Sequence, residues 1–403
     1  MRVFALDGAD RGLAAAITAL AGWWNWLTHR SAAGTSHGFG SRGIRSAFAA
    51  AMMQTLLAIT VVSGLGAACM DVDPPTGSED SALSAQDWTG PISIAPPGST
   101  HAGAAVAALG GTTYVVYTEG TSFSDDAPVY FTRQLPDQSW APATVVPGAV
   151  ASRSNNELSL VAYGGSLYLA TWKEGSSFTT PIPTLSRWDS VSGAWSLPSH
   201  LPFFGRLTGA AVHDGRLVLA WTDAVTASIK LASIDVSGAL AAGPMTPFVG
   251  SNADVASYGG RLYLAYTTAS SVQDVVLTSF DGTSWGAPQP IATGFGGILH
   301  GRPRIAAYST GYTSCLHLGA KEQWGDPEIW WTYHCGSTWA LPVTIPGSDG
   351  NRDWCSFALG MGAGRLFLLH RAATRLDLVV QTYTYPPVAK PPKWIDPIPP
   401  ILK

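Results

Sequence analysis

The stretch Gly259-Gly260-Arg261-Leu262-Tyr263-Leu264-Ala265, followed by Ser279-Phe280-Asp281-Gly282-Thr283-Ser284-Trp285, decides the fold. It combines a glycine turn, an apolar strand and a polar turn that ends in tryptophan. Paired glycines suit the positive φ angles of a tight hairpin turn, and the short apolar run after them suits a buried strand. The stretch therefore predicts a small antiparallel unit with a tryptophan at its outer corner.

Both markers recur along the chain. The turn is repeated at Gly110-Gly111, Gly164-Gly165, Asp214-Gly215, Gly259-Gly260, a degraded Thr310-Gly311, and Ala363-Gly364. The corner tryptophans are Trp88, Trp140, Trp195, Trp285 and Trp339, with Leu240 at the decayed position. The second residues of successive turns are 45 to 54 positions apart, and repeats of about 40–50 residues with four short strands are typical of β-propellers.

Six sets of the first three strands lie between Thr100 and Tyr385, whereas the segment at Trp88 is a fourth strand without a blade of its own. We therefore expect an all-β fold, a six-bladed β-propeller of four-stranded antiparallel blades, closed by the N-terminal strand at Trp88. Trp394 also fits the tryptophan–proline marker and is the alternative closing strand.

The turns that precede the tryptophans carry a resemblance. Ser279–Trp285 and Asp189–Trp195 resemble degenerate Asp-box (BNR-type) repeats of sialidase-like propellers. The whole unit is similar to fucose-binding propeller lectins of bacteria and fungi, over roughly Gln86 to Tyr385. The resemblance implies a propeller, and as functions either lectin-like glycan binding or sialidase-like hydrolysis.

The N-terminal region predicts export. An apolar run, Ala47–Val62, follows Arg42 and Arg45 and precedes small residues that end at Cys69. This order is typical of a secretory signal, and the final cysteine resembles a bacterial lipobox. Gly66 stands where that motif prefers leucine, so secretion after ordinary cleavage and an uncleaved anchor remain alternatives.

Four segments follow from these patterns. Residues 1–68 are a signal region, whose first forty or so are either an extended basic segment or lie ahead of the true start of translation. Residues 69–85 are a lipidated Cys69 with a flexible acidic tether, residues 86–385 are the propeller, and residues 386–403 are a proline-rich tail. The expected location is the bacterial envelope, with the membrane contacted through the lipid anchor.

Composition narrows the function classes. Only 12% of the 403 residues are charged, and the net charge is -4, so no nucleic-acid partner is expected. The chain shows no spacing typical of metal ligands and no phosphate-binding loop. We therefore expect no metal and no cofactor, and a monomeric propeller.

Charged residues gather just before the inner strands, where a propeller opens its central channel. The arginines in this repeat position are Arg153, Arg206, Arg302, Arg304 and Arg352, accompanied by Glu157, Asp254 and Asp353. Guanidinium groups suit carboxylates and vicinal hydroxyls, so these arginines are candidate ligand-binding residues. Bridging between blades is the alternative role.

A second candidate set ends the second strand of each blade. The aromatic members are Tyr117, Trp172, Trp221 and Tyr266. Flat rings next to charges can stack on sugar faces, as the resemblance to the lectins implies, although packing between blades would require the same residues.

The sequence thus favours a non-catalytic glycan-binding protein. A sialidase-like hydrolase is the enzymatic alternative, with Glu157 or Asp353 as its acid, but no tyrosine is placed by a motif. A protein-interaction scaffold is the third class.

Two cysteines fall symmetrically about Gly325 in a predicted hairpin. Cys315 and Cys335 are therefore expected to face each other and form a disulfide in an oxidising compartment. Pairing of Cys335 with Cys355 is the alternative.

Overall fold

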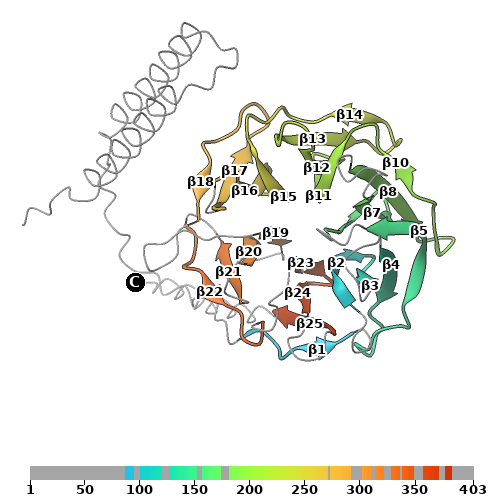
Figure 1. Ribbon diagram of the computed structural model, residues 1–403. Helices are drawn as coiled ribbons and strands as arrows, with labels where there is room; N and C mark the ends of the chain where they lie inside the picture. The colour runs from blue at the N-terminus through green and yellow to red at the C-terminus, as the bar shows by residue number, and fades with distance from the viewer. Residues whose placement is uncertain are drawn as a thin grey trace, which may run out of the picture. The chain divides into compact units, whose positions relative to one another are not determined.

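The computed structural model describes residues 87–94, 100–119, 127–151, 157–173, 181–270, 273–291, 302–309, 314–321, 328–335, 338–348, 357–371 and 377–383. These residues form six antiparallel sheets that stand as blades around a central axis (Figure 1). The fold is the expected six-bladed β-propeller, and the described part contains no α-helix. The predicted signal region, the Cys69 tether and the proline-rich tail lie outside the described residues.

The strands follow the order of the repeat. Blade 1 holds β2 (Thr100–Leu109), β3 (Thr112–Glu119), β4 (Ala127–Arg133) and β5 (Thr144–Ala151). Blade 2 holds β6 (Ser159–Tyr163), β7 (Ser166–Lys173), β8 (Ile182–Asp189), β9 (Ala194–Trp195) and β10 (Ser199–His200). Blade 3 holds β11 (Gly205–His213), β12 (Arg216–Asp223), β13 (Ile229–Ile234) and β14 (Leu240–Ala242).

Blade 4 holds β15 (Gly250–Tyr258), β16 (Arg261–Thr268), β17 (Val275–Phe280) and β18 (Gln289–Pro290). Blade 5 holds β19 (Arg302–Ser309), β20 (Ser314–Lys321), β21 (Ile329–His334) and β22 (Val343–Thr344). Blade 6 holds β23 (Ala358–Gly362), β24 (Arg365–Arg371), β25 (Leu378–Tyr383) and β1 (Ile92–Ser93).

Blade 2 departs from the four-stranded pattern because its outer strand is split. Both β9 and β10 pair with β8, and Pro198 lies between them. Proline has no N–H to donate to a ladder, which explains the interruption.

The N-terminal strand closes the ring, as expected. Ile92 pairs with Val380, and Trp88 forms a bridge with Tyr383 at the other end of the propeller sequence. The Thr89 amide donates to the carbonyl of Thr382, and the Gln381 side chain donates to the carbonyl of Thr89. Trp394 lies outside the described residues.

The glycine turns have the predicted geometry. In blade 1 both turn residues, Gly110 and Gly111, have positive φ angles of 58° and 79°. This is the arrangement that a two-residue hairpin of this twist requires, and at the corresponding turn Asp214 and Gly215 also have positive φ.

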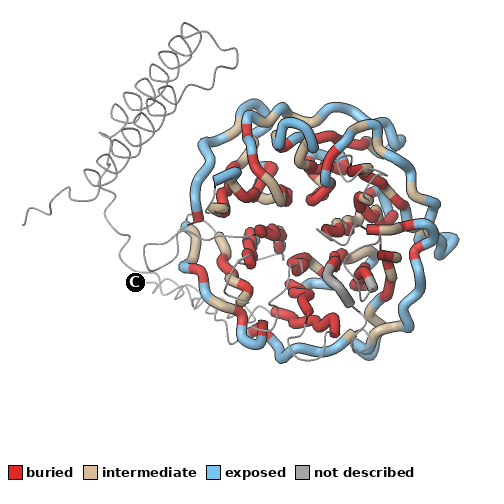
Figure 2. The backbone as a smooth tube through the Cα atoms, viewed as in Figure 1, coloured by how far each residue is buried: buried red, intermediate tan, exposed pale blue. Residues whose placement is uncertain are grey.

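Apolar clusters fill the interfaces between blades. Each of the six clusters joins residues of two neighbouring blades. Figure 2 shows the inner strands mostly buried and the outer rim mostly exposed. The ring is therefore stabilised by side chains packed blade against blade.

Blade 5 contains the expected disulfide. Cys315 on β20 is joined to Cys335, just after β21, with a Cα–Cα distance of 4.2 Å. Cys355 lies outside the described residues.

Candidate functional site

The channel mouth collects charges from four blades. Glu157 directly precedes β6, Arg206 belongs to β11, Asp254 to β15, and Arg302 and Arg304 to β19. Glu157, Asp254 and Arg304 are buried, whereas Arg206 is exposed. Arg153, Arg352 and Asp353 lie outside the described residues.

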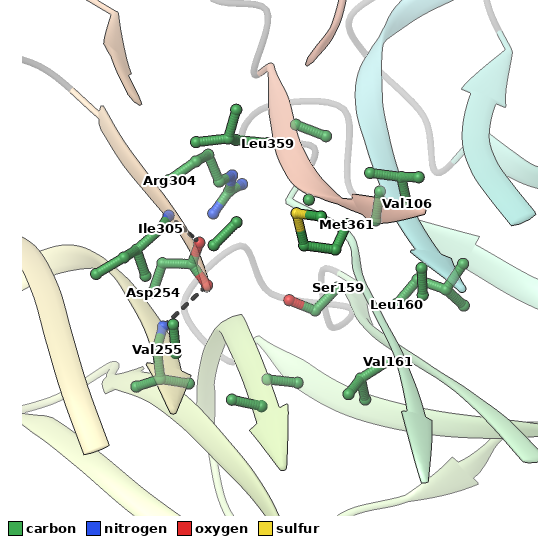
Figure 3. Close-up of a pocket in the computed structure, with 18 of the residues that line it drawn as sticks. Val106, Ser159, Leu160, Val161, Asp254, Val255, Arg304, Ile305, Leu359 and Met361 are labelled. Carbon is green, nitrogen blue, oxygen red and sulfur yellow. Dashed lines mark hydrogen bonds between the residues drawn. The ribbon is translucent and has the colours of Figure 1, made fainter. Parts of the chain in front are cut away.

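Below the mouth, the channel forms a cavity of about 310 Å³ lined by all six inner strands. Most of its wall is alanine and other apolar side chains, because inner strands near the axis have little room. Asp254 and Arg304 are the charged groups among the described lining residues, and Figure 3 shows them facing each other across one side of the cavity.

Arg304 spans the mouth. Its Nε donates to the carbonyl of Phe357 in blade 6 at 3.2 Å, and its Nη1 donates to the carbonyl of Thr208 in blade 3 at 3.1 Å. Because these bonds link Arg304 of blade 5 to blades 6 and 3, it contributes to the architecture of the ring as well as to the charge of the mouth.

Asp254 is anchored by backbone groups. Its carboxylate accepts hydrogen bonds at 3.0 Å from the amides of Val255 and of Ile305 in the next blade. A Cβ at Gly209 would approach the Asp254 Cα and Oδ1 to 2.8 Å, so this carboxylate is packed tightly by blade 3. Burial raises the pKa of Asp254 to about 6, although the charge of Arg304 and the two amides act in the opposite direction.

Glu157 is the most enclosed carboxylate of the cluster. Burial raises its pKa, while the positive charges of Arg304, Arg302 and Arg206 lower it. Its Oε1 has no hydrogen-bond partner among the described residues. A buried polar atom without a partner is costly, which makes it a candidate for contact with a ligand group or water.

The aromatic residues predicted as sugar platforms are all buried. Tyr117, Trp172, Trp221 and Tyr266 have exposed fractions of 7% or less. Protein groups cover their rings: Phe203 stacks on Trp221 with centroids 3.9 Å apart, and the Arg206 guanidinium lies 5.5 Å from the Trp172 ring. The burial of these four rings opposes a role in stacking on sugars, and that role stays a prediction. The four side chains pack within the blades and between them.

Phe204 is an exposed aromatic that sequence analysis missed. It lies two residues before Arg206, in the crossover to β11, and 64% of its surface is exposed. The sequence feature that could have revealed it is the Phe203-Phe204 pair. Neighbouring side chains point in different directions, so Phe203 covers Trp221 and Phe204 remains exposed.

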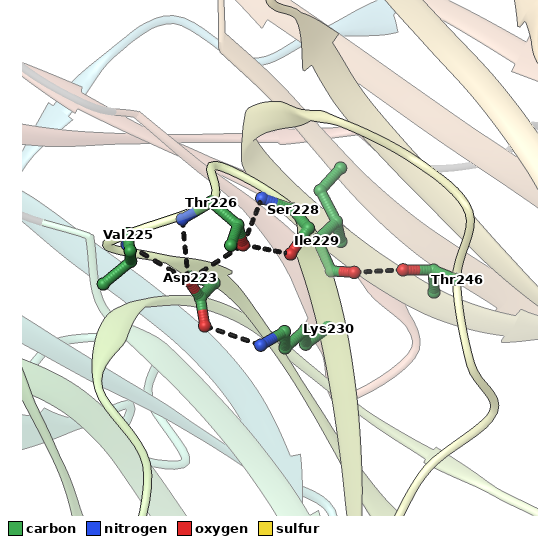
Figure 4. Close-up of polar contacts among 7 residues, drawn as sticks. All are labelled: Asp223, Val225, Thr226, Ser228, Ile229, Lys230 and Thr246. Atoms are coloured by element: carbon green, nitrogen blue, oxygen red, sulfur yellow. Dashed lines mark hydrogen bonds and ion pairs between the residues drawn. The ribbon is translucent and has the colours of Figure 1, made fainter.

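Hydrogen bonds to the Asp223 carboxylate hold the turn after β12. Asp223 accepts hydrogen bonds from the amides of Val225 and Thr226 and binds the Lys230 Nζ at 2.6 Å (Figure 4). The hydrogen bond from Lys230, followed by the Thr226 amide, holds the pKa of Asp223 far below its usual range. This carboxylate has its acceptor positions filled and is a structural element of the loop face.

The described ranges contain neither a metal-binding cluster nor a membrane-spanning helix. No cluster of three or more His, Cys, Asp or Glu side chains is arranged to hold a metal ion there. No helix there has the length and hydropathy needed to cross a membrane.

No protein family matches the sequence, and no curated protein is similar enough to count as a relative. The structure, however, is similar to solved propellers. The α-L-arabinofuranosidase of Fusarium graminearum with arabinobiose has a TM-score of 0.52 and 13% identity, over 73% of this chain and 98% of that one. The fold is common to both.

Two further propellers show the same likeness. The Trypanosoma rangeli sialidase in complex with the inhibitor DANA has a TM-score of 0.54 and 12% identity, over 73% of this chain and 59% of the sialidase. The Aleuria aurantia lectin in complex with Fucα1-6GlcNAc has a TM-score of 0.51 and 13% identity, over 71% of this chain and 93% of the lectin. Sialidase-like and lectin propellers are therefore structural neighbours, as the resemblance implied.

Proposed function

We propose that this protein binds a glycan at the channel mouth, without hydrolysing it. The observation that carries the proposal is the cluster in which Arg206, Arg302 and Arg304 act on the buried Glu157. Guanidinium and carboxylate groups together can bind the vicinal hydroxyls of a sugar, and Arg206 remains open to solvent.

Phe204 adds an apolar surface to this face. An exposed ring two residues from Arg206 can pack on the face of a sugar, while the charged groups bind its hydroxyls. Ligand pockets commonly combine apolar area with a few converging polar groups. The structural neighbours support the ligand class, since the three named above were solved with an arabinobiose, a sialidase inhibitor and a fucosylated disaccharide.

A glycan array with the purified protein tests this proposal, followed by fluorogenic sialoside and arabinofuranoside assays. Array binding that is lost in Arg206→Ala, with no turnover, supports a lectin. Silence on the array and in both assays contradicts glycan binding and favours an interaction scaffold.

Hydrolysis is the second candidate, and one observation favours it. Burial raises the pKa of both Glu157 and Asp254, and a carboxyl group whose pKa is raised above its ordinary value is better suited to act as a general acid. Turnover of either fluorogenic substrate that is lost in Glu157→Gln would establish this function in place of the lectin.

We further propose that the chain is exported and anchored to the envelope through a lipid on Cys69. The support is the order of basic, apolar and small residues before that cysteine. Fractionation of cells that produce Cys69→Ser tests it: the variant should leave the membrane fraction, whereas continued attachment would point to the Ala47–Val62 run as the anchor.

A further inference from the structure

A second pocket opens on the face of the ring that carries the hairpin turns, opposite the channel mouth. Its volume is about 350 Å³, and it lies between blades 6 and 1, lined by the turns that follow β2, β4 and β23 and by the first residues of β3 and β24. It shares no lining residue with the central cavity. Pockets of about 300–1,000 Å³ are the usual size for small ligands.

Tyrosines bridge the corresponding space at three other blade interfaces. The inner strands of blades 2, 4 and 5 end at a tyrosine, or one residue after it, and its hydroxyl donates to a backbone carbonyl at the first hairpin of the next blade. The three bonds run from Tyr163 to Gly215, from Tyr258 to Ser314 and from Tyr308 to Gly364, at 2.9, 2.9 and 3.3 Å. In each case the tyrosine side chain crosses from one blade to the hairpin of the next.

Blade 6 has a glycine at this position. Gly362 pairs with Arg365 across its hairpin, as Tyr258 pairs with Arg261 in blade 4. A Cβ at Gly362 would approach the methyl group of Thr113 to 2.4 Å and its hydroxyl oxygen to 2.6 Å, so no larger side chain fits there while Thr113 keeps its position. The interface between blades 6 and 1 therefore lacks the tyrosine bridge, and the pocket opens beside the turn that a tyrosine would cover.

A buried hydroxyl in the wall of this pocket is unpaired. Thr113 is 1% exposed, and its Oγ1 has no hydrogen-bond partner among the described residues. A buried polar atom of this kind is costly unless a ligand or a water molecule bonds it. Phe367, Leu135 and Pro136 supply apolar surface in the same pocket.

One positive charge belongs to the pocket. Arg365 is partly buried and is the charged residue among the described lining residues. Its Nη1 donates to the Oε1 of Gln138 at 3.2 Å, which is a neutral partner, and no carboxylate in the described part of the chain lies within ion-pair distance of it. Because a guanidinium has five N–H donors, most of this group is available to an acceptor that carries negative charge.

We infer that this pocket binds a small organic monocarboxylate. The carboxylate accepts hydrogen bonds from the Arg365 guanidinium and the Thr113 hydroxyl, while the apolar part of the ligand packs on Phe367, Leu135 and Pro136. A single guanidinium balances a single negative charge, which favours a carboxylate over a phosphate dianion. The inference does not depend on the glycan site proposed at the channel mouth.

Saturation-transfer NMR with benzoate at millimolar concentration tests the pocket, with benzamide as the neutral counterpart. Benzoate should show transfer and benzamide much less. Arg365→Gln should weaken benzoate binding at least about tenfold. Arg261→Gln is the matched control and should leave binding unchanged, since Arg261 begins the second strand of blade 4 as Arg365 does in blade 6, but Tyr258 bridges the interface there.

Thr113→Val tests the hydroxyl separately from the charge. Valine has nearly the same shape, and the hydroxyl that it removes has no partner among the described residues. The thermal midpoint of Thr113→Val should therefore not fall, whereas the affinity for benzoate should fall about threefold. A lower thermal midpoint with unchanged affinity would show that the hydroxyl serves the fold and would contradict its role in binding.

Arg206→Ala separates this pocket from the channel mouth, whose arginines also attract anions. Benzoate binding that survives Arg206→Ala and is lost in Arg365→Gln supports the pocket, whatever becomes of the glycan site. Binding that Arg365→Gln leaves intact, an equal loss in Arg261→Gln, equal transfer to benzamide, or no transfer to benzoate overturns the inference. Displacement of benzoate by inorganic phosphate at a lower concentration than by acetate would assign the site to phosphate and would also overturn it.

Discussion

The channel mouth and the blade interfaces are built by neighbouring parts of the same strands, yet their chemistry is opposite. The interfaces bury Trp, Tyr and Leu side chains in six apolar clusters, whereas the mouth buries Glu157, Asp254, Arg302 and Arg304. Burial of apolar side chains stabilises the fold in proportion to the area removed from water. Burial of a charge costs hydration free energy, and interactions with partner groups offset only part of that cost. The comparison indicates that the interfaces maintain the ring, while the mouth retains charge at some cost to stability.

The largest expected effect concerns the interface that closes the ring. Trp88 is buried and packs against Trp331 and Tyr383, with ring centroids 5.6 and 5.5 Å apart. Trp88→Ala should lower the free energy of unfolding by about 3–5 kcal/mol, since it leaves a cavity at the closure. Denaturant titration measures this, and Ile92→Ala, at an exposed position of the closing strand β1, is the control. Equal losses in both variants would contradict the comparison.

The second effect concerns the cost of charge in the mouth. The pKa of Asp254 is about 6 in the folded protein, above its ordinary value of 3.8, so the unfolded chain binds fewer protons between these values. Stability should therefore fall as the pH rises from about 4 to about 6, by about 3 kcal/mol for this group. Glu157 acts in the same direction.

Asp254→Asn cannot titrate and should flatten that part of the stability profile. The test is to measure the unfolding free energy of both proteins across this pH range and to compare how steeply it changes with pH. A constant difference in unfolding free energy, caused by the altered hydrogen bonds of the variant, does not affect this comparison. Parallel profiles would show that the mouth carries no such cost.

The third effect separates binding from stability. Arg206 is exposed, so Arg206→Ala should change the unfolding free energy by less than about 1 kcal/mol while it weakens glycan binding about tenfold. Arg216→Ala removes an exposed arginine from the opposite face of the same blade and should leave binding unchanged. Similar losses of affinity in the two variants would mean that net charge, not the mouth, attracts the ligand.

The smallest effect is at the surface turn after β12. Lys230 is about half exposed, with a side-chain exposure of 47%, and exposed ion pairs contribute at most about 1 kcal/mol. Lys230→Ala should cost less than this, and should raise the pKa of Asp223 toward its ordinary value, which NMR titration can follow. A larger loss would place this turn among the elements that maintain the ring.

The blade count, the closing strand and the hairpin disulfide could be predicted from the sequence because they follow from local patterns. A tight hairpin turn requires positive φ angles, so Gly110-Gly111 and its copies mark each blade regardless of the rest of the chain. The tryptophan at position 88 stood outside the six sets of strands, and only ring closure gives it a partner. The positions of Cys315 and Cys335 about one turn placed them opposite each other for the same reason.

The sites were decided by the tertiary structure, because the same residue type serves packing or binding according to what covers it. The sequence could not distinguish Trp221, which Phe203 covers, from Phe204, which remains open. Nor could it show that Arg304 is bonded across three blades while Arg206 faces solvent. Hairpin turns depend on neighbours along the chain, whereas exposure and charge environment depend on groups that are distant in the sequence. The Asp254 carboxylate and the Ile305 amide of the next blade, for example, meet only when the blades pack together.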